Sequence, residues 1–454
     1  MISIAHKIEL MPNNKQKTYF HKAFGCARLA YNWGLAEWQR RHKEGEQFSM
    51  ADIRKSFNAI KKEQFPFVRE VTKYATQQPF INLDRAYTKF FSDLKNGIVS
   101  YPKFKRKKDN YGSFYMGGDI ISLSDINKNL KTKIQKPHNL NLKYQYLKVQ
   151  KMGWVKMTER LRFKGKINSV TVSKEGDRYY ASFNMFITEE EYKRTHPHAF
   201  SAKSDNKVGI DLGTRQTMML SDGVSIGNPR FHKNNEAELK KLARQMMKRT
   251  HAKNKQEKEQ GIIKSKNFQK SSLKLCNMHR RISNRRYDFI QKLTTILVTH
   301  YDVIAMENLN VNEMMQIHRL STLVRDVSFS EICRQIEYKS AINKTSLIKA
   351  DRFFPSSKTC SVCGKIKCDL QTNEKIFHCQ ECGTIINRDY NASLNLLGMV
   401  SNHKIGTDYP KSTPEDLTVL LSRFEKNGIA TSKVDTGRRL YCKSFKSDGV
   451  SWEF

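Results

Sequence analysis

A chain of 454 residues in which 38% are hydrophobic can bury the cores of several domains, which excludes a disordered tail or a single small module. Its 81 Lys and Arg residues outnumber 44 Asp and Glu residues, so the formal net charge is +37. A chain with this charge repels itself unless a polyanion neutralises it, which predicts a nucleic acid partner. The 25 Phe, 18 Tyr and 4 Trp residues supply cores and stacking surfaces that a solvated basic protein lacks.

The first 110 residues predict one strand followed by helices. Residues 2–10 alternate as a strand does, and residues 13–48 place apolar side chains at helical spacing. Helices are also expected over 52–60 and 69–94, where Pro79 should bend or interrupt the second helix. A basic linker then follows, with Lys103, Lys105, Arg106, Lys107 and Lys108.

Short alternating runs between about residues 111 and 187 predict a small sheet or barrel, in which Glu175-Gly176-Asp177 supplies a hairpin turn. The polar stretch 188–206 indicates a domain boundary. Beyond it, strand-like runs alternate with helical sequence up to about residue 397, which predicts an α/β domain; the runs include VGIDLG, TMMLSDG, DVIAMEN and TSLIKA.

Polar helical sequence interrupts this α/β pattern at residues 239–286. The interruption contains 16 Lys and Arg residues and only 2 Glu residues. A solvated helix face is the alternative, but this charge density favours contact with phosphates.

Nine cysteines are present, and four of them form two CxxC pairs. The first residues lack the features of a signal peptide, and no stretch is apolar over the length of a bilayer, so we expect a cytoplasmic protein without a membrane partner. In that compartment a metal site is favoured over disulfides. The 15-residue separation of the pairs is typical of a structural Zn²⁺ site, with the ligands Cys360, Cys363, Cys379 and Cys382.

Glycines follow the second cysteine of each pair, at Gly364 and Gly383, where the chain must turn toward the metal. Cys368 lies between the pairs and is a competing ligand in principle. The other cysteines have no partner at a useful spacing and are interpreted as packing residues; they are Cys26, Cys276, Cys333 and Cys442.

Three carboxylates stand at the ends of predicted elements. Asp211 ends an apolar strand, Glu307 follows the strand 303–306, and Asp389 begins a helix, where N-capping is the alternative. Each acid alone is most often a cap, a turn former or a surface residue. Together, from two strands and a helix, they can converge on two divalent cations, which need several carboxylates.

In this order, VGIDLG, AMENLN and NRDYNASLNLL resemble the three RuvC motifs of the TnpB family of transposon-encoded RNA-guided endonucleases, relatives of type V CRISPR effectors. DRFFPSSKTCSVCG at 351–364 and YNWGL at 31–35 extend the resemblance to roughly residues 1–400. It implies a multidomain α/β and β fold: an RNase H-like (RuvC) nuclease domain with a zinc ribbon insert, plus an N-terminal wedge β-barrel interrupted by a helical recognition domain.

The resemblance also implies boundaries. These are the first barrel strand at 1–10, the helical recognition domain at 11–110, the wedge barrel at 111–204, the RuvC-like domain at 205–354 with its basic helical insert at 239–286, the zinc ribbon at 355–386, the end of the RuvC-like domain at 387–400, and a tail at 401–454 to which no role is assigned.

The activity implied is RNA-guided cleavage of DNA next to a short adjacent motif, by two-metal-ion hydrolysis. Asp211, Glu307 and Asp389 match the catalytic acids that bind Mg²⁺ or Mn²⁺, and Arg388 matches the basic residue beside the third acid. The partners implied are a guide RNA derived from the transposon end and target double-stranded DNA, with nucleoid association when DNA is bound. Asn308 departs from the family, in which an acidic residue often follows the glutamate.

Lys73 and Gln77 lie four residues apart in a predicted helix, where the resemblance implies residues that read the adjacent DNA motif. An ordinary exposed helix face is the alternative. Two other functions stay open: an RNA-guided DNA-binding repressor without cleavage, and a transposase or resolvase that uses protein contacts alone. Copurifying RNA would separate the guided functions from the last one, and the sequence leaves the oligomeric state open.

Overall fold

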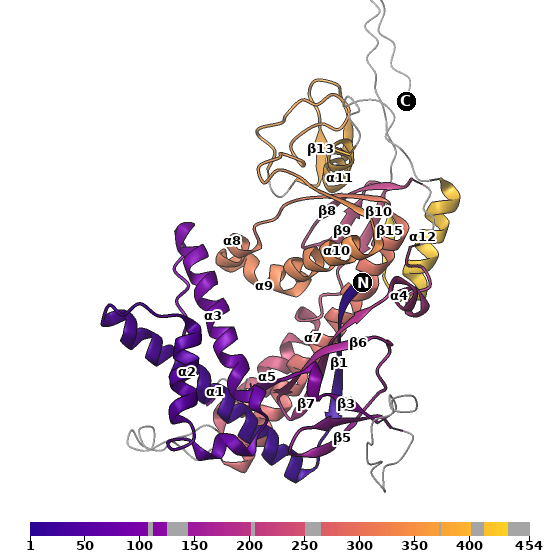
Figure 1. Ribbon diagram of the computed structural model, residues 1–454. Coiled ribbons are helices and arrows are strands. Elements are labelled where there is room, and N and C mark those ends of the chain that lie inside the picture. Colours follow the sequence, from indigo (N-terminus) through magenta and orange to yellow (C-terminus); the bar gives the residue numbers. More distant parts are fainter. Residues whose placement is uncertain are drawn as a thin grey trace, which may run out of the picture. The chain divides into compact units, whose positions relative to one another are not determined.

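The computed structural model describes residues 1–107, 112–124, 144–200, 205–249, 265–371, 374–400 and 413–434 (Figure 1). The chain divides into two compact units, residues 1–197 and residues 198–454, and each contains its own large sheet. The expected combination of an all-β sheet and an α/β part is confirmed at this level. None of the helices in the described ranges has the length and apolar content that crossing a bilayer requires.

The first unit is built on a seven-stranded sheet in the order β2-β6-β7-β1-β5-β4-β3, in which every pairing is antiparallel. β6 and β7 are joined at Gly176, whose φ of 62° suits a tight turn, so the predicted hairpin is confirmed. The strands are β1 (Ile2–Met11), β2 (Gly112–Gly117), β3 (Ser122–Leu123), β4 (Tyr146–Val149), β5 (Gly153–Met157), β6 (Lys166–Glu175) and β7 (Arg178–Ile187).

β1 pairs with both β7 and β5, so the start of the chain lies in the middle of a sheet whose other strands come after residue 111. The helices therefore interrupt the sheet in sequence. They are α1 (Asn14–Lys43), α2 (Met50–Ile60) and α3 (Lys73–Lys95), and the short α4 (Glu189–Thr195) follows the last strand. Capping boxes at Asn13 and Ser49 fix the starts of α1 and α2.

Pro79 is expected from the sequence to bend or interrupt the helix predicted over 69–94, but it does not interrupt it, because α3 continues through Pro79 to Lys95. The expected start at residue 69 is also wrong, since residues 66–70 form a 3₁₀ turn and α3 begins at Lys73. A proline removes one backbone hydrogen bond, and packing compensates for it here. Pro79 is buried, and the neighbouring Phe80 contacts α1 so closely that a Cβ on Gly34 would lie 2.9 Å from its ring.

The second unit is built on a six-stranded sheet in the order β12-β11-β8-β9-β10-β15. β11 is parallel to both β8 and β12, and the remaining pairings are antiparallel. The strands are β8 (Lys207–Leu212), β9 (Gln216–Leu220), β10 (Val224–Gly227), β11 (Val303–Met306), β12 (Ser346–Lys349) and β15 (Thr431–Lys433). The predicted strands VGIDLG, TMMLSDG, DVIAMEN and TSLIKA are therefore confirmed.

Helices cover both faces of this sheet. Val208 and Ile210 share one face, because they are two residues apart in β8, and they belong to one core with α7 (Lys266–His300) and α10 (Phe329–Asn343). The opposite face packs on α11 (Arg388–Gly398), through clusters that contain Met219 and Ala305. The site described below therefore lies on a sheet that is held from both sides.

Part of the tail at 401–454, to which the sequence assigns no role, completes this unit. α12 (Pro414–Lys426) buries Leu420 and Phe424 in the same core as the parallel strands, and β15 pairs antiparallel with β10 (Figure 1). Residues 401–412 and 435–454 lie outside the described residues.

The basic insert consists of α5 (Glu236–Lys248) and the first half of α7, and its residues 250–264 lie outside the described residues. Leu239 of α5 packs on Met278 and Ile282 of α7, whereas Arg249, just beyond α5, donates a hydrogen bond to Ser271. The two helices are therefore antiparallel. Short helices α8 (Val311–Gln316) and α9 (His318–Val327) follow β11, and the hairpin of β13 (Ile376–His378) and β14 (Ile385–Asn387) precedes α11.

Candidate functional site

Asp211 and Glu307 lie side by side at the carboxyl edge of the parallel strands. In the register of β8 and β11, Ile210 is opposite Met306, so the next residue of each strand is one of the two acids. Parallel strands that are buried on both faces present functional side chains at their ends, where the chain leaves the core. The pairing thus brings together two carboxylates that are 96 positions apart in sequence.

Asp389 comes to the same site on α11. This helix approaches β8 so closely that a Cβ on Gly209 would lie 2.0 Å from the carbonyl oxygen of Ser393, a distance that only glycine permits. The helix is capped by Asn387, whose side chain accepts hydrogen bonds from the backbone N–H of Asp389 (3.0 Å) and of Tyr390 (3.1 Å). The N-cap alternative for Asp389 is therefore wrong, and its carboxylate stands in the first turn, near the positive helix end.

The three acids are partly buried, and their charges act on Asp211 and Glu307. Burial raises the pKa of Asp211 well above its usual value, the charges of Glu307 and Asp389 raise it further, and Arg388 opposes them. Burial also raises the pKa of Glu307, and a 2.6 Å hydrogen bond from the Ser356 hydroxyl counteracts this. The protein alone thus leaves negative charge here incompletely compensated, as expected where cations bind.

The four cysteines are grouped more tightly than the three carboxylates. Among the described residues, the four cysteines form the only group of three or more His, Cys, Asp or Glu side chains whose ligand atoms all lie within 4.8 Å of one another. The three acids interact electrostatically but do not meet that limit.

Cys360, Cys363, Cys379 and Cys382 converge as their spacing predicts. The Sγ atoms of Cys360 and Cys382 are 3.6 Å apart, and those of Cys363 and Cys379 are 3.5 Å apart. A tetrahedral site with Zn–S bonds of about 2.3 Å would separate its sulfurs by about 3.8 Å, so the four thiols fit Zn²⁺. Burial raises the pKa of the Cys363 thiol, an effect that a bound cation would reverse.

The turns that hold these thiols use the two glycines. Gly364 (φ 76°) and Gly383 (φ 71°) adopt the left-handed conformation, and each donates its N–H to the carbonyl of the first cysteine of its pair. Cys368 is exposed and does not belong to the group.

The remaining cysteines differ in their surroundings. Cys26 is buried and Cys333 packs against the core of the second unit, as expected. Cys276 is exposed, so its interpretation as a packing residue is wrong; the apolar side of α7 at Leu275 and Met278 faces α5 instead. Cys442 lies outside the described residues.

Two buried asparagines of α11 connect the cysteine turns to the acids. Asn391 donates to the carbonyl of Thr359 (2.7 Å) and accepts from the N–H of Ser361 (2.9 Å). Asn395 donates to the carbonyls of Thr359 and Ser356, both at 2.7 Å. These positioning residues and Ser356 were missed from sequence; the signal is two amides one turn apart within an otherwise apolar helix face.

Lys73 and Gln77 lie in the first turns of α3 in the first unit. Lys73 is exposed, its Nζ is 3.8 Å from a carboxylate oxygen of Asp119, and it lies 5.0 Å from the centre of the Tyr74 ring. Gln77 is partly exposed. The structure thus presents both residues at the surface of one helix, which leaves their predicted role untested.

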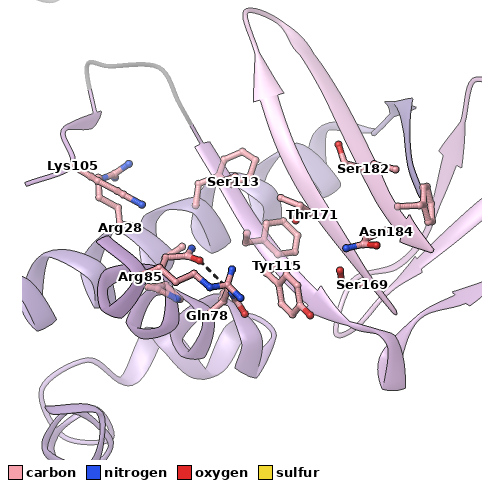
Figure 2. Close-up of a pocket in the computed structure, with 18 residues that line it drawn as sticks. Arg28, Gln78, Arg85, Lys105, Ser113, Tyr115, Ser169, Thr171, Ser182 and Asn184 are labelled. Atoms are coloured by element: carbon pink, nitrogen blue, oxygen red, sulfur yellow. Dashed lines mark hydrogen bonds between the residues drawn. The ribbon is translucent and has the colours of Figure 1, made fainter. Parts of the chain in front are cut away.

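A separate polar pocket of about 350 Å³ lies beside the same helix, between α1, α3 and the sheet (Figure 2). Gln78, not Gln77, contributes to its wall, and Gln78 donates a 3.2 Å hydrogen bond to Asn82. Its polar and charged lining comprises Arg28, Gln78, Asn82, Arg85, Lys105, Ser113, Tyr115, Ser169, Thr171, Ser182 and Asn184. Sequence reasoning missed this pocket because its residues come from seven separate segments.

Basic side chains form a stripe on α7, which we call the α7 stripe: Lys270, Lys274, Arg281 and Arg285. All four are exposed, and at about 100° per residue they fall within roughly 60° of one another around the helix axis. Clustering on one face, beside the apolar contacts with α5, favours polyanion binding over an evenly solvated helix.

Comparisons with known proteins place the chain in a class. Three family models match it, described as "Helix-turn-helix domain" (residues 1–47), "Probable transposase" (191–318) and "Cas12f1-like, TNB domain" (329–396). The first of these segments is folded here as β1 and the single continuous helix α1. The other two span the strands that carry Asp211 and Glu307 and the helix that carries Asp389.

Two of three relatives match over most of their length, and the third matches over about a quarter. A "Putative RNA-guided DNA endonuclease" of Streptomyces pristinaespiralis is 28% identical over 396 residues, 87% of this chain and 88% of that protein. "Putative RNA-guided DNA endonuclease InsQ" of Escherichia coli (strain K12) is 24% identical over 413 residues, 87% of this chain and 91% of that protein. "TnpB-like protein L79" of Acanthamoeba polyphaga mimivirus is 30% identical over 143 residues, 30% of this chain and 26% of that protein.

A solved structure, "Structure of the mini-RNA-guided endonuclease CRISPR-Cas_phi3", aligns with 90% of this chain and 94% of its own, with 9% identity and a TM-score of 0.46. The family models and relatives define the chain as a transposase-related protein. These matches confirm the resemblance to the TnpB family that the ordered motifs around the three acids predicted.

Proposed function

We propose that the chain is an RNA-guided DNA endonuclease that cleaves target DNA next to a short adjacent motif. The observation that carries this proposal is the register of β8 and β11, which sets Asp211 beside Glu307 while α11 supplies Asp389. Relatives that match over most of this chain carry the name of putative RNA-guided DNA endonucleases, which supports the same activity.

Asp211, Glu307 and Asp389 would hold divalent cations, Mg²⁺ or Mn²⁺. Carboxylate oxygens are the ligands these ions prefer, and the raised pKa values of Asp211 and Glu307 fit a site whose charge a cation completes. When bound, two such ions supply activation of the attacking water and stabilisation of the departing 3′ oxygen. The chain itself orients Glu307 through the Ser356 hydroxyl and places Arg388 beside the acids.

On this proposal the second unit is an RNase H-like (RuvC) domain, with the cysteine turns as its zinc ribbon. Zn²⁺ held by the four thiols would fix the turns that lead into α11. The first unit corresponds to a wedge barrel interrupted by a helical recognition domain, a reading supported by β1 pairing within a sheet whose other strands follow the helices. The predicted domain boundaries are proposed on the same basis.

Sequence choice would come from base pairing between the guide RNA and one DNA strand, while basic surfaces hold the heteroduplex through its backbone. The α7 stripe is the most concentrated such surface we identify, and phosphate contacts explain its charge. Lys73 and Gln77 would read the adjacent motif from the exposed start of α3. Target opening would then deliver single-stranded DNA to the acids.

The test combines cleavage and binding in one set of variants. The protein is expressed with the transposon-end RNA and given a matched plasmid with a randomised flank and Mg²⁺. Replacing Asp211, Glu307 or Asp389 by Ala should each abolish cleavage but leave guided binding intact, because pairing and phosphate contacts lie elsewhere. The matched control is Asp288→Ala, which removes an acid that is 63% exposed on α7 and should cleave normally.

Three outcomes would contradict the proposal. Wild-type cleavage rates in Asp389→Ala would place the active site elsewhere. Guided binding without cleavage by the wild type, under every flank, would favour the repressor. Full and specific DNA binding by RNA-free protein would favour the protein-only transposase or resolvase.

A further inference from the structure

Phe353 is the most exposed aromatic side chain in the described part of the chain, with 84% of its surface accessible. Its neighbour Phe354 turns the other way and packs against the cluster of Ala305, Ala350 and Leu396. Single exposed apolar residues are common on protein surfaces and usually need no explanation. The position of this ring, and the way its loop is held, set it apart.

The loop that carries Phe353 begins and ends at the acidic edge of the sheet. It leaves β12 at Ala350, whose N–H donates to the carbonyl of Met306 (2.9 Å), directly before Glu307. It returns at Ser356, whose hydroxyl donates to Glu307 itself. Three residues span at most about 11 Å of extended chain, so the Phe353 backbone lies within that distance of Ser356.

Hydrogen bonds fix the loop in the shape that exposes the ring. The Asp351 carboxylate accepts the N–H of Phe353 (2.9 Å), and the Asp351 carbonyl accepts the N–H of Phe354 (3.1 Å). Asn395 of α11 holds the carbonyl of Ser356 (2.7 Å). Phe353 is therefore presented outward by a turn that is anchored at both ends, and within the described residues the ring has one recorded partner, a neighbouring arginine.

That arginine is Arg352. Its guanidinium lies 5.7 Å from the centre of the Phe353 ring, and it forms an ion pair with Glu313 of α8, a side chain that is 62% exposed. An exposed ion pair contributes little stability and exchanges readily for a stronger partner. A phosphate is such a partner, and a guanidinium plane also stacks on bases.

An exposed ring beside a cation, within reach of a nuclease site, suits one kind of ligand. Bases within a duplex stack on one another, whereas unpaired bases are free to stack on aromatic side chains. At about 3.4 Å per base step, the upper limit of about 11 Å between the Phe353 and Ser356 backbones corresponds to at most roughly three nucleotides. We propose that Phe353, supported by Arg352, stacks an unpaired base of the DNA strand that enters the site of Asp211, Glu307 and Asp389.

This inference rests on the proposed endonuclease activity and adds a substrate contact to it. The ring holds the strand one to three nucleotides from the bond to be cut, and Arg352 leaves Glu313 for a phosphate of that strand. Because stacking tolerates any base, the contact fixes the position of the strand without selecting its sequence. Phe353 is thus a substrate-positioning residue.

The test uses the full-length protein loaded with guide RNA and bound to matched DNA, in the Asp211→Ala background so that no strand is cut and the thiol-bound zinc is retained. 2-Aminopurine, whose fluorescence is quenched by stacking, is placed at successive positions of each strand. At one position or a few adjacent positions, the protein that retains Phe353 should quench the probe. Phe353→Ala should abolish the quenching, and Phe353→Trp should retain it. The ring is exposed, so these variants should fold normally.

Cleavage in Mg²⁺ is measured in parallel. Phe353→Ala should slow single-turnover cleavage about 5- to 100-fold, the range expected for loss of one base–aromatic contact, and Phe353→Trp should restore it. The matched control is Phe67→Ala, an aromatic side chain that is 48% exposed in the first unit. If Phe353→Ala cleaves at the wild-type rate and quenches the probe as the protein that retains Phe353 does, the stacking role alone is overturned. If the wild type does not cleave, the proposed endonuclease activity is overturned.

Discussion

Replacing all four residues of the α7 stripe by Ala should weaken binding of RNA and make the remaining binding much less sensitive to salt. Lys270, Lys274, Arg281 and Arg285 are exposed on one side of α7. Fifteen residues of helix cover about 22 Å, so a nucleic acid strand that follows the helix can contact all four. Their removal deletes charge but no core contact, since Leu275, Met278 and Ile282 make the packing with α5.

The magnitude follows from counterion release. Each phosphate contact contributes about 0.7 to the slope of log affinity against log salt on single strands, and about 0.9 on duplex. Loss of four contacts should therefore lower the slope by roughly 3 to 3.6. Because that loss is largest at low salt, the affinity difference between variant and wild type should shrink as salt increases.

The assay is a titration of labelled guide RNA at several salt concentrations, with the slope as its result. The matched control is the double variant Lys240→Ala and Lys292→Ala. These lysines lie on α5 and α7 but pair with Glu236 (2.5 Å) and Asp288 (2.7 Å), so they contribute little net field. An unchanged slope in the fourfold variant would refute phosphate contact by the α7 stripe. The same conclusion would follow if the control variant lost as much slope for each removed charge as the fourfold variant does.

Two further predictions concern the metal sites. Folding raises the pKa of Asp211, so the native protein retains a proton that the unfolded chain releases near pH 4. The free energy of unfolding of the metal-free protein should therefore fall as the pH rises above that value. Asp211→Asn should therefore raise the melting temperature in EDTA at neutral pH; an unchanged or lower value would contradict this. Cys379→Ser should remove the one zinc per chain that elemental analysis should find in wild type, and zinc-free active protein would disprove the assignment.

The local patterns that sequence carries were enough to predict the strands around the acids. An apolar run of four or five residues followed by a carboxylate predicts a buried strand that ends at a surface, and β8 and β11 have this form. The pattern does not contain the register between them. That register depends on the α7 and α10 core beneath the sheet, which is built from residues far apart in sequence.

Other features needed the tertiary structure. Asn387 and Asp389 are both good capping residues two positions apart, and the choice between them depends on where α11 meets Gly209. β15 pairs with β10 across about 200 residues, and no local period signals such a pairing. The helix α12, which precedes β15, is recognisable from the sequence, because its apolar residues have the spacing of an amphipathic helix: Leu417, Leu420, Leu421 and Phe424.

The hydrogen bonds of α11 change the expected consequence of losing zinc. From sequence, the cysteine turns precede Asp389, so metal loss should disturb the chain entering that acid. In the structure, Asn395 holds both Thr359, beside the first cysteine, and Ser356, whose hydroxyl orients Glu307. Loosened cysteine turns would therefore release Glu307 as well as Asp389. Two of the three acids depend on one anchored segment, whereas Asp211, held within β8 by pairing on both sides, does not.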